Sequence, residues 1–169
     1  VAVMSWFTQR LLLPNGIAAP LWWRVFGSGS LLAVFAQCLF GGRMATTWAA
    51  KRCLSQGDAC NWLALHQSSA VPVTAFVFLF VITSLLVGGW PRSQWPFLIG
   101  VVGLLIVQIV LGVSTFRLGL DQPLLTVLHQ LAAALLIALL SALIARKPEV
   151  IQKTSISAAK QTYLEPCHG

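Results

Sequence analysis

Four long apolar runs constrain the fold of this chain more than any other feature of its sequence. They cover residues 22–42, 66–88, 97–116 and 123–144, and each is close to the roughly 20 residues that an α-helix needs to cross a bilayer. Only 9% of the 169 residues are charged, whereas about a quarter are charged in a typical soluble domain. The sequence therefore predicts four transmembrane helices, and this hydropathy excludes a soluble nucleic-acid-binding protein.

Short connections between the runs predict the architecture. Helices joined by short loops lie antiparallel to their neighbours, so we expect an all-α fold: an integral membrane four-helix bundle with up-down topology at residues 22–146. Residues 1–21 have a short apolar patch and no small-residue cleavage site, which favours an interfacial segment over a signal peptide. Residues 147–169 are expected to form a polar tail.

The positive charges lie at the ends of the predicted helices, where flanking Lys and Arg residues set the orientation of a membrane protein. The chain has a net charge of +7. Seven cations fall on one predicted side, at positions 10, 24, 92, 146, 147, 153 and 160, and four on the other, at 43, 51, 52 and 117. This asymmetry predicts that both termini lie in the cytoplasm.

A pattern of glutamine, glycine and histidine occurs twice along the predicted helices. It consists of Gln37, Gly41 and the pair His66-Gln67 in the first two helices, and of Gln108, Gly112 and the pair His129-Gln130 in the last two. His129 lies about 12 Å along its helix at 1.5 Å per residue, and His66 lies at a comparable depth in a parallel helix. Ionisable groups inside a membrane usually face the bundle interior and mark function.

These two histidines can therefore face each other, and neutral imidazole is a good ligand for haem iron. The pair predicts a bis-histidine haem site, with Gln37 and Gln108 as groups that orient the rings. In the alternative interpretation, both histidines only pack in the bundle and bond to these glutamines. The glycines can equally serve close helix packing.

The predicted outer loop carries Cys53 and Cys60. On the oxidising side of a bacterial membrane a disulfide between them would close a small loop, contributing roughly 2.5 kcal/mol; two free thiols are the alternative. Arg43 and Arg117 reach the same surface and can pair with haem propionates or with lipid head groups. A zinc site is less well supported, because no fourth ligand joins the two cysteines and His66.

The stretch QIVLGVSTFRLGLDQPLLTVLHQLAAALL, residues 108–136, resembles the haem A synthase family most specifically. The Gln37–Gly41 helix, the two-cysteine loop and His66 extend the resemblance to residues 27–145. That family has eight membrane helices in two halves. The N-terminal half oxidises a methyl group of haem O to the formyl group of haem A, and the C-terminal half holds haem b.

This chain resembles the C-terminal half alone. The resemblance makes His66 and His129 the axial ligands of haem b, and Cys53 and Cys60 the loop disulfide. It implies a part in converting haem O to haem A, with a second four-helix half or another copy of the chain, and the cytochrome oxidase assembly machinery, as partners. The catalytic half of the family uses an acidic residue in its first outer loop, whereas this loop has only Asp58, between the cysteines.

Catalytic residues are therefore not identified, and whether the chain alone is an enzyme stays open. Two other interpretations remain. One is a non-catalytic electron-transfer cytochrome with a single bis-histidine haem, and the other is a membrane assembly subunit without a cofactor.

Overall fold

The computed structural model describes residues 1–12, 18–43, 61–118 and 122–148. Within these ranges all regular secondary structure is helical. The predicted disulfide partners Cys53 and Cys60, the loop acid Asp58 and the polar tail from residue 149 onward lie outside the described residues.

Four long helices confirm the predicted fold class. They are α2 (Leu21–Gly42), α4 (Asn61–Val87), α6 (Trp95–Arg117) and α7 (Pro123–Ala145), and each is long and apolar enough to cross a membrane. Two shorter helices, α1 (Ala2–Leu12) and α5 (Gly89–Ser93), complete the described structure. These four long helices are consistent with a multi-pass membrane protein.

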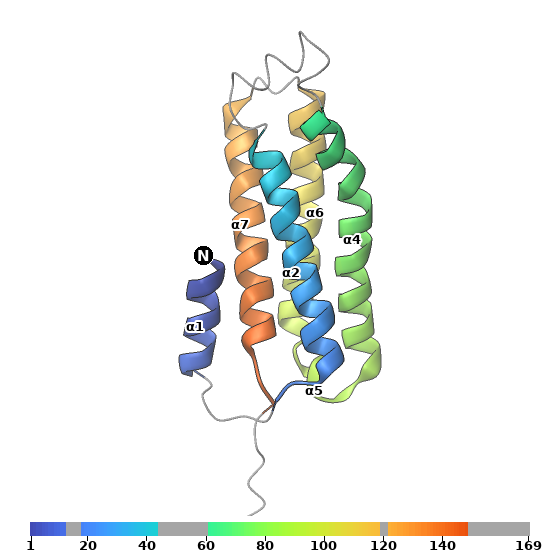
Figure 1. The fold of residues 1–169 in the computed structure, drawn as a ribbon, viewed down its shortest axis with the longest axis vertical. Helices are drawn as coiled ribbons and strands as arrows, with labels where there is room; N and C mark the ends of the chain where they lie inside the picture. The colour runs from blue at the N-terminus through green and yellow to red at the C-terminus, as the bar shows by residue number, and fades with distance from the viewer. Residues whose placement is uncertain (13–17, 44–60, 119–121, 149–169) are drawn as a thin grey trace, which may run out of the picture.

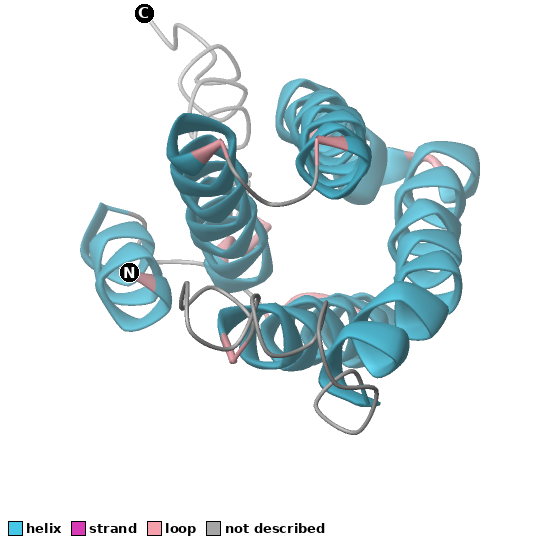
Figure 2. Ribbon diagram, turned by 90° about the horizontal axis from the view of Figure 1, so that it is seen from above, coloured by secondary structure: helices cyan, strands magenta, loops and turns pink. Residues whose placement is uncertain are grey.

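The long helices run alternately up and down in one bundle (Figure 1). Seen from above, they surround a common axis (Figure 2), and α2 packs on both α4 and α7 while α6 packs mainly on α7. The contact between α4 and α6 is the slightest among neighbouring long helices. The short helix α1 lies against α7 (Figure 1). This contact does not test the interfacial position expected for residues 1–21, which stays a prediction.

Proline and glycine mark where these helices begin and turn. Pro96 and Pro123 lie in the first turns of α6 and α7, where the missing N–H has no intrahelical partner in any case. Gly88 and Gly89 link α4 to α5 with φ values of 76° and 60°, a left-handed conformation that glycine adopts without steric penalty. Pro72 lies inside α4.

The packed core occupies only one half of the bundle. We call the end where α2 begins and α7 ends the terminal end, and the opposite end the histidine end. Trp23, near the terminal end, is fully buried, and its ring lies 5.1 Å from those of both Phe80 and Trp90. Buried residues of α2 stop at Val34, and those of α4 start only at Val77.

The other two helices repeat this asymmetry. Buried residues of α7 start at Ala132, and those of α6 stop at Leu105 apart from Thr115 near the helix end. Among the described residues, the half of the bundle next to the histidine end therefore has almost no closely packed core.

Candidate functional site

The structure brings His66 and His129 together at the histidine end. Both lie in the second turn of their helices, α4 and α7, which start at the same end of the bundle. Their ring centres are 6.4 Å apart, and the ring planes are inclined by 84°. The expectation that two histidines at matched depth face each other is confirmed.

His66 is fixed by two reciprocal contacts with Gln37 of α2. Its Nδ1 lies 3.0 Å from the Gln37 carbonyl oxygen, and the Gln37 side-chain amide donates a 2.6 Å hydrogen bond to the His66 carbonyl oxygen. A carbonyl only accepts, so the shared proton belongs to Nδ1. The lone pair of His66 is therefore on Nε2. A backbone carbonyl that accepts the other ring N–H commonly orients a metal-binding imidazole.

Ser69 adds a third group to this network. Its hydroxyl oxygen lies 2.6 Å from Gln37 Oε1 and 2.6 Å from the Leu65 carbonyl oxygen, and its single proton can be donated to either acceptor. Ser69 follows His66 by almost one helical turn, so both side chains face α2. Ser69 was not predicted as part of the site, because the sequence around a helical serine does not indicate which side chain its hydroxyl contacts.

His129 has an incomplete set of partners. Its Nε2 lies 3.2 Å from Nε2 of Gln108 on α6, which makes the amide the donor and the ring nitrogen the acceptor. His129 Nδ1 and Gln108 Oε1 are both buried without a hydrogen-bond partner among the described residues. Leaving a buried polar group unsatisfied costs about 1–3 kcal/mol, so this side of the pair favours binding of a further group.

A glycine of the neighbouring helix accommodates each ring. A Cβ at Gly41 would lie 2.9 Å from His66 Cε1, and one at Gly112 would lie 3.0 Å from His129 Cε1. Glutamine and glycine four residues apart share one helix face, so each repeat supplies a polar group and a space for one ring. This geometry explains why glutamine, glycine and histidine recur together. Each glycine leaves the space that a histidine ring of the next helix occupies.

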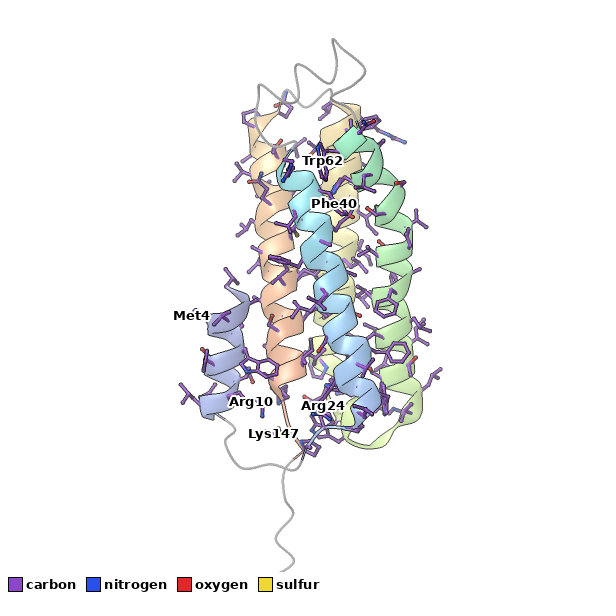
Figure 3. The ribbon with its side chains drawn as sticks, viewed as in Figure 1. Met4, Arg10, Arg24, Phe40, Trp62 and Lys147 are labelled. Carbon is purple, nitrogen blue, oxygen red and sulfur yellow. The ribbon has the colours of Figure 1, made fainter. Side chains whose placement is uncertain are left out.

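Aromatic side chains surround one of the cations expected at the histidine end. The guanidinium of Arg43 lies 4.6 Å from the ring centre of Trp62, whose ring lies 6.0 Å from that of Phe40. Figure 3 shows Phe40 and Trp62 close together at this end. Arg43 and Arg117 are both exposed here, and the aromatic pair was not predicted.

Two histidines alone suit a haem better than a bare metal ion. Among the described residues no group of three or more His, Cys, Asp or Glu side chains gathers, so the tetrahedral set that zinc prefers is not formed there. Two imidazoles on opposite sides of one metal ion, with bonds of about 2 Å, have their ring centres about 6 Å apart. The observed 6.4 Å fits that arrangement.

The cysteines differ in what the structure describes. Cys38 lies half-buried in α2 as a free thiol. Cys53 and Cys60 lie outside the described ranges, so their disulfide stays a prediction.

Comparison of the chain with models of known protein families, with curated proteins and with solved structures gives no match. The haem A synthase resemblance therefore rests on the quoted residues alone.

Proposed function

We propose that this chain is a membrane haem protein in which His66 and His129 bind opposite faces of one haem b iron. The observation that carries the proposal is the 6.4 Å separation of the two rings. It is supported by their position in the half of the bundle where the described residues form almost no packed core. A flat, bulky and largely apolar group is suited to such a region.

The surrounding residues have distinct parts in this proposal. Gln37 and Ser69 hold the His66 ring with Nε2 available for the iron. His129 Nε2 accepts a hydrogen bond from the Gln108 amide in this structure, so the amide would have to release this nitrogen before it could bind iron. Arg43 and Arg117 offer positive charge to the propionates. The haem, when bound, supplies a reversible one-electron couple, whose potential depends on burial and on the hydrogen bonds of the axial ligands.

On the basis of the resemblance to the haem A synthase family, we further propose that the chain acts in the conversion of haem O to haem A. It would correspond to the half that holds haem b. All four acidic residues of the chain lie outside the described ranges. Because the chain resembles the half of the family that holds haem b, we assign the oxidation chemistry to a partner: a second four-helix half or another copy of the chain, associated with cytochrome oxidase assembly.

The proposed location is a bacterial cell membrane, with both termini in the cytoplasm. Described cations support it: Arg10, Arg24, Arg92, Arg146 and Lys147 lie at the terminal end, and Arg43 and Arg117 at the histidine end. Positive residues near helix ends remain preferentially on the cytoplasmic side. The histidine end then faces outward.

Absorption spectroscopy of the purified full chain tests haem binding. The oxidised and dithionite-reduced protein, with a pyridine haemochrome assay, should give a low-spin b-type spectrum and one haem per chain. His66→Ala and His129→Ala should each lose or alter this spectrum. Gln67→Ala and Gln130→Ala replace exposed neighbours of the two histidines and serve as matched controls. Wild-type spectra in both histidine variants would contradict the site.

A non-catalytic electron-transfer cytochrome is the second candidate, because the histidine pair is the only part of the site that it needs. Both candidates predict the same spectrum, and haem A formation separates them. The chain should be expressed with and without the N-terminal half of a haem A synthase, in cells that supply haem O. Haem A that depends on the chain supports the first candidate. A haem-loaded chain with no such effect supports the second, and the absence of haem supports an assembly subunit without a cofactor.

A further inference from the structure

A basic pocket opens at the terminal end of the bundle, away from the histidines. It has a volume of about 590 Å³ and lies between α1, α2 and α7. Four cations line it: Arg10, Arg24, Arg146 and Lys147. Figure 3 shows the three of them that it labels, Arg10, Arg24 and Lys147, gathered at this end.

The described lining of this pocket carries charge of one sign. It consists of the four cations and five uncharged residues, while Glu149, two residues after Lys147, lies outside the described range. Clefts lined by one sign of charge concentrate ions of the opposite sign. The pocket therefore favours an anionic ligand.

Aromatic rings hold two of the arginines in place. The Arg146 guanidinium lies 4.4 Å from the ring centre of Phe97, and that of Arg10 lies 4.8 Å from the ring centre of Trp6. Arg146 Nε is buried and has no hydrogen-bond partner among the described residues. A guanidinium whose plane is already fixed loses less entropy when it binds phosphate oxygens with two parallel hydrogen bonds.

The position of the pocket indicates which phosphate it binds. It lies where α2 begins, at Leu21, and where α7 ends, at Ala145, which is the depth of lipid head groups if both helices span the bilayer. Leu11, Leu12 and Leu21 beside it are exposed apolar residues and can contact acyl chains. Basic pockets between membrane helices are known to bind anionic lipid head groups.

We propose that this pocket binds the phosphate head group of an anionic phospholipid. The site is independent of the haem proposal, because it lies at the opposite end of the bundle and shares no residue with the histidine pair. Bound there, the lipid would join α1 to α2 and α7 by neutralising cations from all three segments.

Native mass spectrometry of the delipidated full chain tests this proposal. The protein in detergent is mixed with equal amounts of cardiolipin and phosphatidylcholine. A second experiment uses equal amounts of phosphatidylglycerol and phosphatidylcholine. The wild-type chain should retain the anionic lipid preferentially. Each pocket cation replaced by glutamine should lower this preference about fivefold, since one cation near a membrane surface contributes about 1 kcal/mol. The variants are Arg24→Gln and Lys147→Gln, singly and together.

Arg92→Gln is the matched control, because Arg92 is exposed on α5 at the same end and does not line the pocket. It should keep the wild-type preference. Arg146→Lys preserves the charge but removes the planar group over Phe97, and it should lose a measurable part of the preference. Circular dichroism should show that every variant keeps its helical content.

Three results would overturn the proposal. The first is equal retention of anionic and neutral lipid by the wild-type chain. The second is an equal loss in Arg92→Gln and in the pocket variants, because bulk charge would then explain the preference. The third is displacement of the lipid by millimolar inorganic phosphate, which would make the site one for free phosphate. None of these results bears on haem binding.

Discussion

At the scale of single residues, the contact between Gly41 and His66 offers the sharpest test of the site. A Cβ at position 41 would come within 2.9 Å of His66 Cε1, whereas one at Gly42 would meet no atom of the described residues within 4 Å. Both Gly→Ala changes gain about 0.8–1 kcal/mol of helix propensity. Only Gly41→Ala forces the ring to move, and overpacking of this kind typically costs about 1–3 kcal/mol.

We therefore expect Gly41→Ala to be less stable than Gly42→Ala by about 1–3 kcal/mol and to have a lower haem-to-protein ratio. Thermal unfolding in detergent measures the first effect and a pyridine haemochrome the second. Equal stability and equal haem content in the two variants would show that the ring does not lie against Gly41.

Two adjacent serines allow a similar comparison. Ser68 and Ser69 can both donate to the Leu65 carbonyl oxygen, but only Ser69 can instead donate to Gln37 Oε1. Ser69→Ala should lose about 1 kcal/mol of stability and bind haem more weakly, because Gln37 then holds His66 less firmly. Ser68→Ala should change neither quantity by a comparable amount. Haem transfer to apomyoglobin measures retention, and equal transfer rates would argue against this network.

The paired histidines could be predicted from the sequence, whereas their contacts could not. Counting residues gives the depth of His66 and His129, because the rise per residue of an α-helix is fixed. The contacts of Ser69 and Trp62 depend on how each helix is rotated about its axis and on which helices are neighbours. Rotation depends on packing, which no short stretch of this sequence specifies.

At the scale of elements, α4 departs from its expected start. The apolar run begins at His66, but the helix begins at Asn61, so His66 lies inside the second turn rather than at the helix start. Hydropathy identifies the part of a helix that lies in the hydrocarbon core of a membrane. The helix itself can extend beyond this part into the interface, because its backbone hydrogen bonds do not depend on apolar side chains. This extra turn gives His66 the same position in its helix as His129, and it places Trp62 near Arg43.

Pro72 lies inside the same helix, between one and two turns beyond His66. Proline has no N–H to donate to the Ser68 carbonyl oxygen and bends a helix. Pro72→Ala should restore this bond and change the direction of the turns that carry His66. We expect a helix that is more stable, by at most about 3 kcal/mol, together with a lower haem content.

Pro96→Ala is the control for this prediction, because Pro96 lies in the first turn of α6, where proline is well tolerated. Pro96→Ala should leave the stability and the haem content close to the wild-type values. Unfolding in detergent and the reduced absorption spectrum measure the two effects. A Pro72→Ala chain with the full wild-type spectrum would show that the bend does not position His66.

At the scale of the whole molecule, the two ends of the bundle differ in packing. Trp23, Phe80 and Leu140 fill the terminal half, while the described residues of the other half have little buried apolar surface. The sequence predicted four helices but not this asymmetry, because the mean hydropathy of a run does not indicate which of its residues are buried. Burial depends on how the helices converge, which hydropathy does not encode.

The orientation of the bundle follows from its charges and can be tested without any cofactor. The up-down arrangement puts α5 at the same end as the start of α2 and the end of α7, with five of the described cations. Since cytoplasmic ends carry the excess of Lys and Arg, a green fluorescent protein fused after residue 148 should fluoresce, and alkaline phosphatase fused there should be inactive. Fusions truncated after Arg92 should behave in the same way.

Fusions after Arg117 give the complementary measurement, because α6 ends at the histidine end. There the phosphatase should be active and the fluorescent protein dark. The opposite result at all three positions would place the histidines on the cytoplasmic side, where reducing conditions disfavour a disulfide between Cys53 and Cys60. The orientation thus decides whether the predicted disulfide is chemically reasonable, and with it whether this loop can be covalently closed at the histidine end.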